Sequence, residues 1–214
     1  MNETDSSIVH ESTSGFGTGA LRVDKLGAMN APLRLEIIVA STRPERFAPV
    51  VAGWLVTALG ERPEFEVGVL DLRDLALPVD LTETPEVEAF RARLAAADAF
   101  VAVTSEYNHG YPASLKTALD SAKHEWRAKP IGFVSYGGLS GGLRAVEQLR
   151  QVVAELHMVS VRESVSFAQA KRRFDKTGMT DDDAAIDACD RMLNQLNWWG
   201  TTLRAARTVE PYPG

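Results

Sequence analysis

From Leu33 onward, short apolar runs alternate with segments whose apolar residues recur at helical spacing. Such a run is typical of a buried strand, and the longer spacing is typical of an amphipathic helix. The expected strands are 35–40, 65–72, 99–104, 131–135 and 158–161, and the expected helices are 50–59, 85–94, 112–122, 145–156 and 180–203. Residues 162–179 fit neither pattern. The alternation predicts a doubly wound α/β fold with a five-stranded parallel sheet.

Two of the expected helices have a recognisable start. Thr84 precedes a proline and Glu86, which is typical of an N-cap followed by the first helical turn. Thr180 stands three residues before Asp183 and resembles a capping box. We therefore expect these two helices to begin directly after Thr84 and Thr180.

Outside the alternating region the chain has a different character. Residues 1–31 carry Ser, Thr, Gly and acidic side chains without apolar periodicity, so we expect a disordered leader. Residues 32–207 are expected to form a single domain, and residues 208–214 a short tail. Met29 lies close to the first strand, and the sequence leaves open whether it is the true start.

Charge and cysteine content exclude several classes of protein. A net charge of -6 argues against a nucleic-acid partner, and no apolar run is long enough to cross a membrane. The first residues lack the pattern of a secretory signal, and one cysteine cannot form an internal disulfide, so we expect a cytoplasmic protein. Cys189 lies on one helix face with Ile186 and Leu193, which predicts a buried hydrophobe rather than a reactive thiol. No metal site is expected.

Polar, glycine and aromatic residues gather in the loops after the first, third and fourth strands. The first loop reads Ser41-Thr42-Arg43-Pro44-Glu45-Arg46-Phe47 where a dinucleotide-binding fold would have a G-x-G-x-x-G motif. Hydroxyls and two arginines before a helix N-terminus suit a phosphate monoester. A proline-containing turn with solvated arginines remains the alternative.

The other two loops suit a flat ligand. Residues 105–111 combine two tyrosines, Asn108, His109 and a glycine, and so could place an aromatic ring against a planar group. Residues 135–142 are glycine-rich and lead into a helix, so backbone N–H groups could approach a ligand that gains negative charge. Each loop taken alone could equally be an ordinary turn.

Three motifs in these regions belong together. They are Ser41-Thr42-Arg43-Pro44-x-Arg46, then Glu106-Tyr107-Asn108-His109-Gly110-x-Pro112 with Leu115-Lys116-x-Ala118-Leu119-Asp120, and Glu125-Trp126-x-x-Lys129-Pro130-x-Gly132-Phe133-Val134-Ser135-Tyr136-Gly137. From about Leu35 to Arg162 the chain thereby resembles the NAD(P)H-dependent FMN reductase family. The resemblance implies a flavodoxin-like fold with the strand order 2-1-3-4-5, one FMN per subunit, and homodimers or homotetramers that complete the site.

The resemblance also assigns roles to individual residues. It implies that Ser41, Arg43, Arg46, Phe47 and Ala48 hold the FMN phosphate, that Glu106, Tyr107, Asn108 and His109 line the isoalloxazine ring, and that Tyr136, Gly137 and Gly138 meet its pyrimidine end. Two departures from the family pattern stand out. Ser105 replaces a proline that often precedes the Glu-Tyr-Asn motif, and Glu45 and Ala48 stand where many members have glycines.

The function implied is oxidation of NADPH or NADH and reduction of a small acceptor such as free flavin, a quinone or an azo compound. No catalytic side chain is expected, because the flavin carries the chemistry. An electron-carrier flavodoxin is the alternative, although two arginines in the phosphate loop count against it. A regulatory protein that has lost its flavin is a third possibility.

Tryptophan content bears on assembly. Trp126, Trp198 and Trp199 are more apolar surface than a small domain readily hides, and aromatic residues are common in interface cores. Packing inside the monomer would account for them almost as well.

Overall fold

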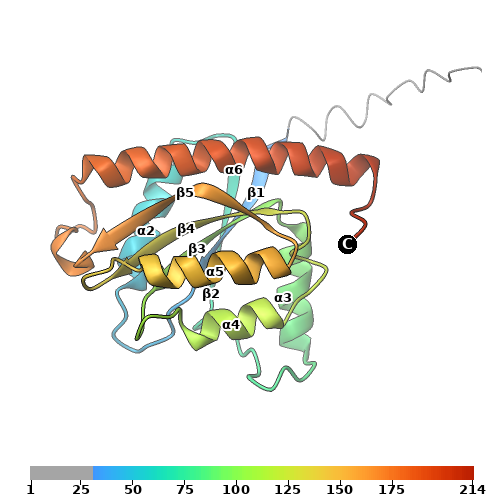
Figure 1. Cartoon of the computed structure of the whole chain (residues 1–214), viewed down its shortest axis with the longest axis horizontal. Helices are drawn as coiled ribbons and strands as arrows, with labels where there is room; N and C mark the ends of the chain where they lie inside the picture. Colours follow the sequence, from blue (N-terminus) through green and yellow to red (C-terminus); the bar gives the residue numbers. More distant parts are fainter. Residues whose placement is uncertain (1–30) are drawn as a thin grey trace, which may run out of the picture. The chain divides into compact units, whose positions relative to one another are not determined.

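The structure is a computed structural model that describes residues 31–214. The predicted leader lies outside these residues except for its last position. Strands β1, β2, β3, β4 and β5 and helices α2, α3, α4, α5 and α6 alternate along the chain (Figure 1). The strands are Leu33–Val39, Phe65–Asp71, Ala99–Ser105, Pro130–Gly137 and Val159–Ala168, and the helices are Ala48–Leu59, Pro85–Ala96, Ala113–Asp120, Leu143–Glu155 and Asp183–Val209.

All five strands form one parallel sheet in the order β2-β1-β3-β4-β5, which confirms the predicted order. The central strands are covered on both faces, and every residue of β3 is buried. Such strands read as continuous apolar runs, which is why the sequence identified them without difficulty. The order reverses next to β1, so the loops after β1 and β3 lie where ligands bind in doubly wound folds.

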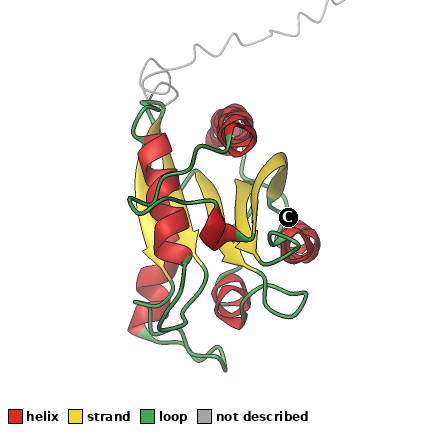
Figure 2. Cartoon of the chain, turned by 90° about the vertical axis from the view of Figure 1, so that its left-hand side faces the viewer, coloured by secondary structure: helices red, strands yellow, loops and turns green. Residues whose placement is uncertain are grey.

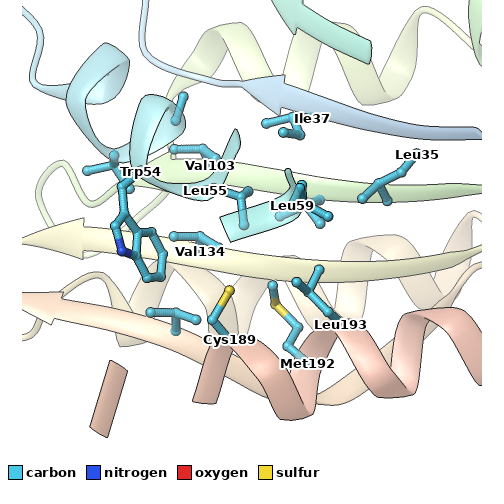
Figure 3. Close-up of a cluster of buried hydrophobic side chains, with 14 of the residues drawn as sticks. Leu35, Ile37, Trp54, Leu55, Leu59, Val103, Val134, Cys189, Met192 and Leu193 are labelled. Carbon is cyan, nitrogen blue, oxygen red and sulfur yellow. The ribbon is translucent and has the colours of Figure 1, made fainter. Parts of the chain in front are cut away.

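Two apolar cores lie on opposite faces of the sheet. Helices α2 and α6 pack on one face, and α3, α4 and α5 pack on the other. Trp54 and Leu55 of α2 lie in the first core together with Cys189 and Met192 of α6. All four pack on the face formed by β1, β3 and β4 (Figure 3). Cys189 is a buried hydrophobe as predicted, and burial raises the pKa of its thiol to about 12.

The end of the sheet differs from the sequence prediction. Strand β5 runs to Ala168, beyond the predicted end at Val161, and a short 3-10 helix, η1 (Ala170–Arg172), follows it. The pairing between β4 and β5 shifts between Ile131 and Phe133, so that Ile131 opposes Ser160 and Phe133 opposes Ser164. Between these two pairs β5 has more residues than β4, and the additional residues of β5 interrupt its apolar alternation. The pattern therefore fails to predict the second half of the strand.

Helix α6 also departs from the prediction at both ends. Its N-cap is Asp182, whose carboxylate accepts a hydrogen bond of 3.2 Å from the Ala185 amide, so the predicted cap at Thr180 is wrong. The helix ends at Val209 rather than near Leu203. By contrast, Thr84 caps α3 as predicted.

The tryptophans do not share one environment. Trp126 is fully buried against Phe90 and Phe100, and its indole N–H donates to the Leu119 carbonyl at 3.1 Å, so of the two alternatives packing inside the monomer holds for Trp126. Trp199 packs partly against the first core, whereas Trp198 is 61% exposed. Within residues 31–214 no helix has the length and apolarity needed to span a membrane.

Candidate functional site

The loops after β1, β3 and β4 meet at one edge of the sheet, because parallel neighbouring strands end on the same side. Figure 2 views the molecule from this side, toward which the β5 arrow of Figure 1 points. Ser41 and Tyr107 share a hydrogen bond of 2.6 Å between their hydroxyls, which joins the first loop to the second. The Glu106 amide donates to the Tyr136 carbonyl at 3.2 Å, which joins the second to the third.

The first loop leaves its backbone donors free. Residues 41–43 and 45–47 lie between β1 and α2, and within the described chain their amides make no hydrogen bond. The loop leads into the positive end of α2. Arg43 is exposed, and its guanidinium carbon lies 5.5 Å from the centre of the Tyr107 ring. Free amides, a helix N-terminus and an arginine together form a cradle for a phosphate group.

Arg46 has surroundings that the sequence did not suggest. Its guanidinium forms a two-pronged ion pair with Asp71 at the end of β2, with both contacts at 2.5 Å. It also donates to the Ser41 carbonyl at 2.6 Å. The hydrogen bond to Asp71 raises the pKa of Arg46, which stays charged. The Arg46 side chain therefore braces the first loop. Its backbone amide and its buried Nε make no hydrogen bond within residues 31–214.

The second loop is a tight turn with two residues in unusual conformations. Tyr107 and Gly110 exchange backbone hydrogen bonds of 2.9 and 3.1 Å. Between them, Asn108 and His109 have positive φ angles of 48° and 75° and are exposed. Left-handed backbone in non-glycine residues is costly and is frequent at ligand-binding sites. The turn holds the Tyr107 ring beside the first loop.

Glu106 serves the loops through its backbone and its ion pair. Its side chain is 4% exposed and accepts hydrogen bonds from the backbone and side-chain nitrogens of Arg144 at 3.2 and 2.6 Å. Burial alone would raise the pKa of Glu106, but hydrogen bonds from Ser140 and Arg144 hold it below its ordinary value. The carboxylate is thus ionised and ties the second loop to the start of α5.

The glycines of the third loop have different tasks. Gly141 and Gly142 have φ angles of 63° and 91°, and a Cβ at either would clash with Ser166 or Ser135. These two are required by the turn itself. A Cβ at Gly138 would meet no atom within 4 Å, so the backbone there borders open space. Gly138 is therefore the point at which a ligand can come close to the chain.

A pocket of about 410 Å³ opens at this point. It is lined by Phe47, Tyr136, Gly137 and Gly138 from the predicted loops, and by Gln169, Ala170, Lys171 and Arg172 from the turn after β5. The last four were not among the residues predicted from the sequence, because the break in β5 hid where that strand ends. Their one signal was the basic run 171–173 in an acidic chain.

Two buried hydroxyls also lie at this edge. Ser105 is 4% exposed and Tyr136 is 6% exposed, and their hydroxyl oxygens make no hydrogen bond within residues 31–214. Burial raises the pKa of Tyr136 to about 12, although the neighbouring Ser105 and Ser41 hydroxyls oppose the shift, so Tyr136 stays protonated. Buried polar groups are almost always paired, so these two are candidates for ligand contacts. Ser105, noted in the sequence only as a departure from a family pattern, thus joins the candidate residues.

These features fit FMN. Phosphate, ribityl hydroxyls and a flat ring match the free amides of the first loop, the two unpaired hydroxyls and the open space at Gly138. All twelve predicted residues lie on these three loops or at the ends of β4 and α2 that border them: Ser41, Arg43, Arg46, Phe47, Ala48, Glu106, Tyr107, Asn108, His109, Tyr136, Gly137 and Gly138.

Comparison with known structures supports the fold. The flavoenzyme FerB, an NAD(P)H:acceptor oxidoreductase from Paracoccus denitrificans, superposes with a TM-score of 0.65 over 79% of this chain and 98% of its own, at 20% identity. An apo NADH:FMN oxidoreductase, EmoB, gives a TM-score of 0.60 over 84% of this chain and 92% of its own, at 19% identity. At such identities the likeness concerns the fold alone.

Sequence comparison is more specific. An NAD(P)H-dependent FMN reductase of Schizosaccharomyces pombe is 38% identical over 137 residues, which cover 58% of this chain and 68% of the relative. An NADPH:quinone oxidoreductase of Arabidopsis thaliana is 34% identical over 137 residues, 61% of this chain and 70% of the relative. Residues 33–172 match the NADPH-dependent FMN reductase family, and the chain belongs to this family.

Proposed function

We propose that this protein is an FMN-dependent oxidoreductase that takes a hydride from NAD(P)H and reduces a small acceptor such as free flavin, a quinone or an azo compound. The observation that carries the proposal is the meeting of three loops at one sheet edge, with free amides, buried unpaired hydroxyls and open backbone. Membership of the NADPH-dependent FMN reductase family supports the same activity.

We assign the cofactor's parts to the loops as follows. Ser41, Arg43 and the amides of residues 46–48 hold the phosphate, residues 106–109 line the ring, and residues 136–138 meet its pyrimidine end. Arg46 and Glu106 support these contacts from behind through Asp71 and Arg144. Bound FMN supplies the redox chemistry, accepting a hydride and passing the electrons on.

The chain itself contributes orientation and electrostatics. We assign no side chain the role of acid, base or nucleophile. We assign the stabilisation of developing negative charge to the Gly137 and Gly138 amides, and the Gly138 backbone borders open space. Phe47 packs edge-on to Tyr136 with ring centres 6.2 Å apart and forms part of the apolar lining of the pocket. Rigid loops fix these donors in advance, which lowers the cost of reorganisation.

An electron-carrier flavodoxin would share the fold and the cofactor but would not oxidise NADPH. Anaerobic mixing of NADPH with the FMN-loaded protein separates the two functions. Rapid loss of the flavin absorbance supports the reductase. A flavin that stays oxidised with NADPH and NADH, yet is reduced by dithionite, overturns it.

We propose further that residues 32–207 form the reductase domain and that it assembles as a cytoplasmic homodimer or homotetramer. Trp198, with 61% of its surface exposed on α6, supports an apolar contact between subunits. A single cysteine that is buried fits a reducing compartment. A monomer by light scattering at micromolar concentration, with full flavin occupancy, would count against the assembly.

A further inference from the structure

The turn after β5 is fixed against the third loop. Gln169 has a φ of 50°, a left-handed conformation that a non-glycine residue adopts at a cost. The Gln169 amide donates to the Gly138 carbonyl at 2.7 Å, and its side-chain oxygen accepts from Arg172 at 2.9 Å. Ala170 is buried beneath the turn. These contacts hold residues 170–172 in one place beside Gly138.

The turn forms one wall of the pocket of about 410 Å³, and Gly137 and Gly138 form another. The proposed function puts the pyrimidine end of the flavin at these glycines. A molecule stacked on the flavin would therefore share this pocket with Lys171 and Arg172. The FMN phosphate is assigned to the loop after β1, so these two cations are free for another group.

Their charges lack acidic partners. Lys171 and Arg172 are exposed, and within residues 31–214 neither forms a salt bridge. By contrast, the neighbouring Arg173 pairs with Asp182 at 3.4 Å. The chain has a net charge of -6, but two unpaired cations make the electrostatic potential positive at this turn, and a positive potential attracts an anion. Arginine with lysine is well suited to a phosphate monoester, which carries nearly two negative charges.

We propose that Lys171 and Arg172 bind the 2′-phosphate of NADPH and thereby make the enzyme prefer NADPH to NADH. The inference rests on the proposed function, since only a nicotinamide-dependent enzyme has this choice to make. The 2′-phosphate lies on the adenosine, remote from the nicotinamide ring that reacts. Lys171 and Arg172 line the pocket and are exposed, so they can meet a group that extends from the pocket toward solvent.

The kinetic test uses the double variant Lys171→Gln, Arg172→Gln loaded with FMN. We expect the KM for NADPH to rise about tenfold or more, the effect of losing charged hydrogen bonds, with kcat and the kinetics with NADH little changed. Lys176→Gln is the matched control, because Lys176 is an exposed cation that lines a separate groove beside α2. It should leave the ratio of NADPH to NADH efficiency as in the wild type.

A direct measurement of ligand binding tests the 2′-phosphate site without relying on turnover. Adenosine 2′,5′-bisphosphate and 5′-AMP differ only in the 2′-phosphate, and calorimetry should find that the wild type binds the bisphosphate more tightly. The double variant should lose that difference. Equal losses for NADPH and NADH, or no difference between the two adenosine ligands in the wild type, would overturn the inference. Failure of both NADPH and NADH to reduce the flavin contradicts the proposed function instead, and the adenosine ligands still decide the 2′-phosphate site.

Discussion

Arg43 and Arg46 belong to the same loop, but their guanidinium groups have different surroundings. Arg43 is exposed beside Tyr107, whereas Arg46 is enclosed and paired with Asp71. The sequence could predict that the loop carries two cations, but it could not predict which one has a carboxylate partner 25 positions along the chain. The structure therefore identifies Arg46 as a brace and leaves the exposed Arg43 as the proposed ligand contact.

Replacing Arg43 separates binding from chemistry. Arg43→Ala should weaken FMN binding by about 1.5–3 kcal/mol, the range for a charged hydrogen bond. The rate of flavin reduction at saturating FMN should change little, because the phosphate is remote from the reacting ring. Gly138→Val has space for its Cβ and should fold. It should nevertheless slow reduction, since it blocks the approach to the backbone. Stopped-flow absorbance on both variants gives the answer, and equal slowing would refute this division.

Replacing Asp71 tests the brace. Asp71→Asn leaves Arg46 enclosed without its counter-charge, so we expect a loss of about 2–3 kcal/mol in the free energy of unfolding. Binding of FMN should weaken as well, because Arg46 also holds the Ser41 carbonyl. Asp74→Asn removes an exposed carboxylate nearby and is the control. Urea denaturation with and without FMN measures both effects, and a stability equal to that of the control would contradict the account.

Among the elements, the sequence predicted the central strands well and the last third of the chain poorly. Strands β3 and β4 are almost completely buried, and β1 is buried except at Arg34 and Glu36, because helices cover both of their faces. Strand β5 lies at the sheet edge, contains Arg162 and Glu163, and shifts its pairing with β4. No local pattern marks such a shift, so the place of the turn that follows could not be predicted, and only its basic run 171–173 stood out in the sequence.

The corrected start of α6 can be tested by a pair of variants. Asp182→Ala removes the cap of the Ala185 amide and should lower the free energy of unfolding by about 1 kcal/mol. Thr180→Ala should cost much less, because Thr180 accepts only a long hydrogen bond from the Asp182 amide. Asp182→Asn keeps a capping oxygen but removes the charge that faces Arg173. Thermal unfolding of the three variants decides between the caps, and a larger loss for Thr180→Ala would restore the original prediction.

At the scale of the whole molecule, the candidate site and a group of buried charges that stabilises the fold lie at opposite ends of the sheet. The carboxyl ends of β1, β3 and β4 carry the candidate site, while buried charges gather at the amino end of β4. There Lys129 donates to the Leu94 and Ala95 carbonyls at 2.7 and 3.0 Å and so closes the end of α3. Burial, with Arg207 nearby, lowers the pKa of Lys129 from 10.5 to about 8, although Asp98 and Glu125 oppose the shift.

This pKa gives stability a definite dependence on pH. Below pH 8 both states hold the proton on Lys129, and the folded state carries the full cost of the buried charge. As the pH rises from about 8 to 10.5, the folded protein loses this proton while the unfolded chain keeps it. The contribution of Lys129 to the free energy of unfolding should therefore become more favourable between pH 8 and pH 10.5, by at most about 3 kcal/mol. Urea denaturation of the wild type and Lys129→Met at pH 7 and pH 9.5 measures it. The same change in the free energy of unfolding for both proteins between these pH values would contradict the assignment.

The central claim is that the three loops form an FMN site whose phosphate lies in the loop after β1. Titration of the flavin-free protein with FMN and with riboflavin, followed by the quenching of flavin fluorescence, tests it most directly. Riboflavin lacks the phosphate that Arg43, the free amides and the start of α2 are proposed to meet. The account predicts that FMN binds far more tightly than riboflavin and that most of this advantage disappears in Arg43→Ala. Equal affinities of the wild type for the two flavins would contradict it.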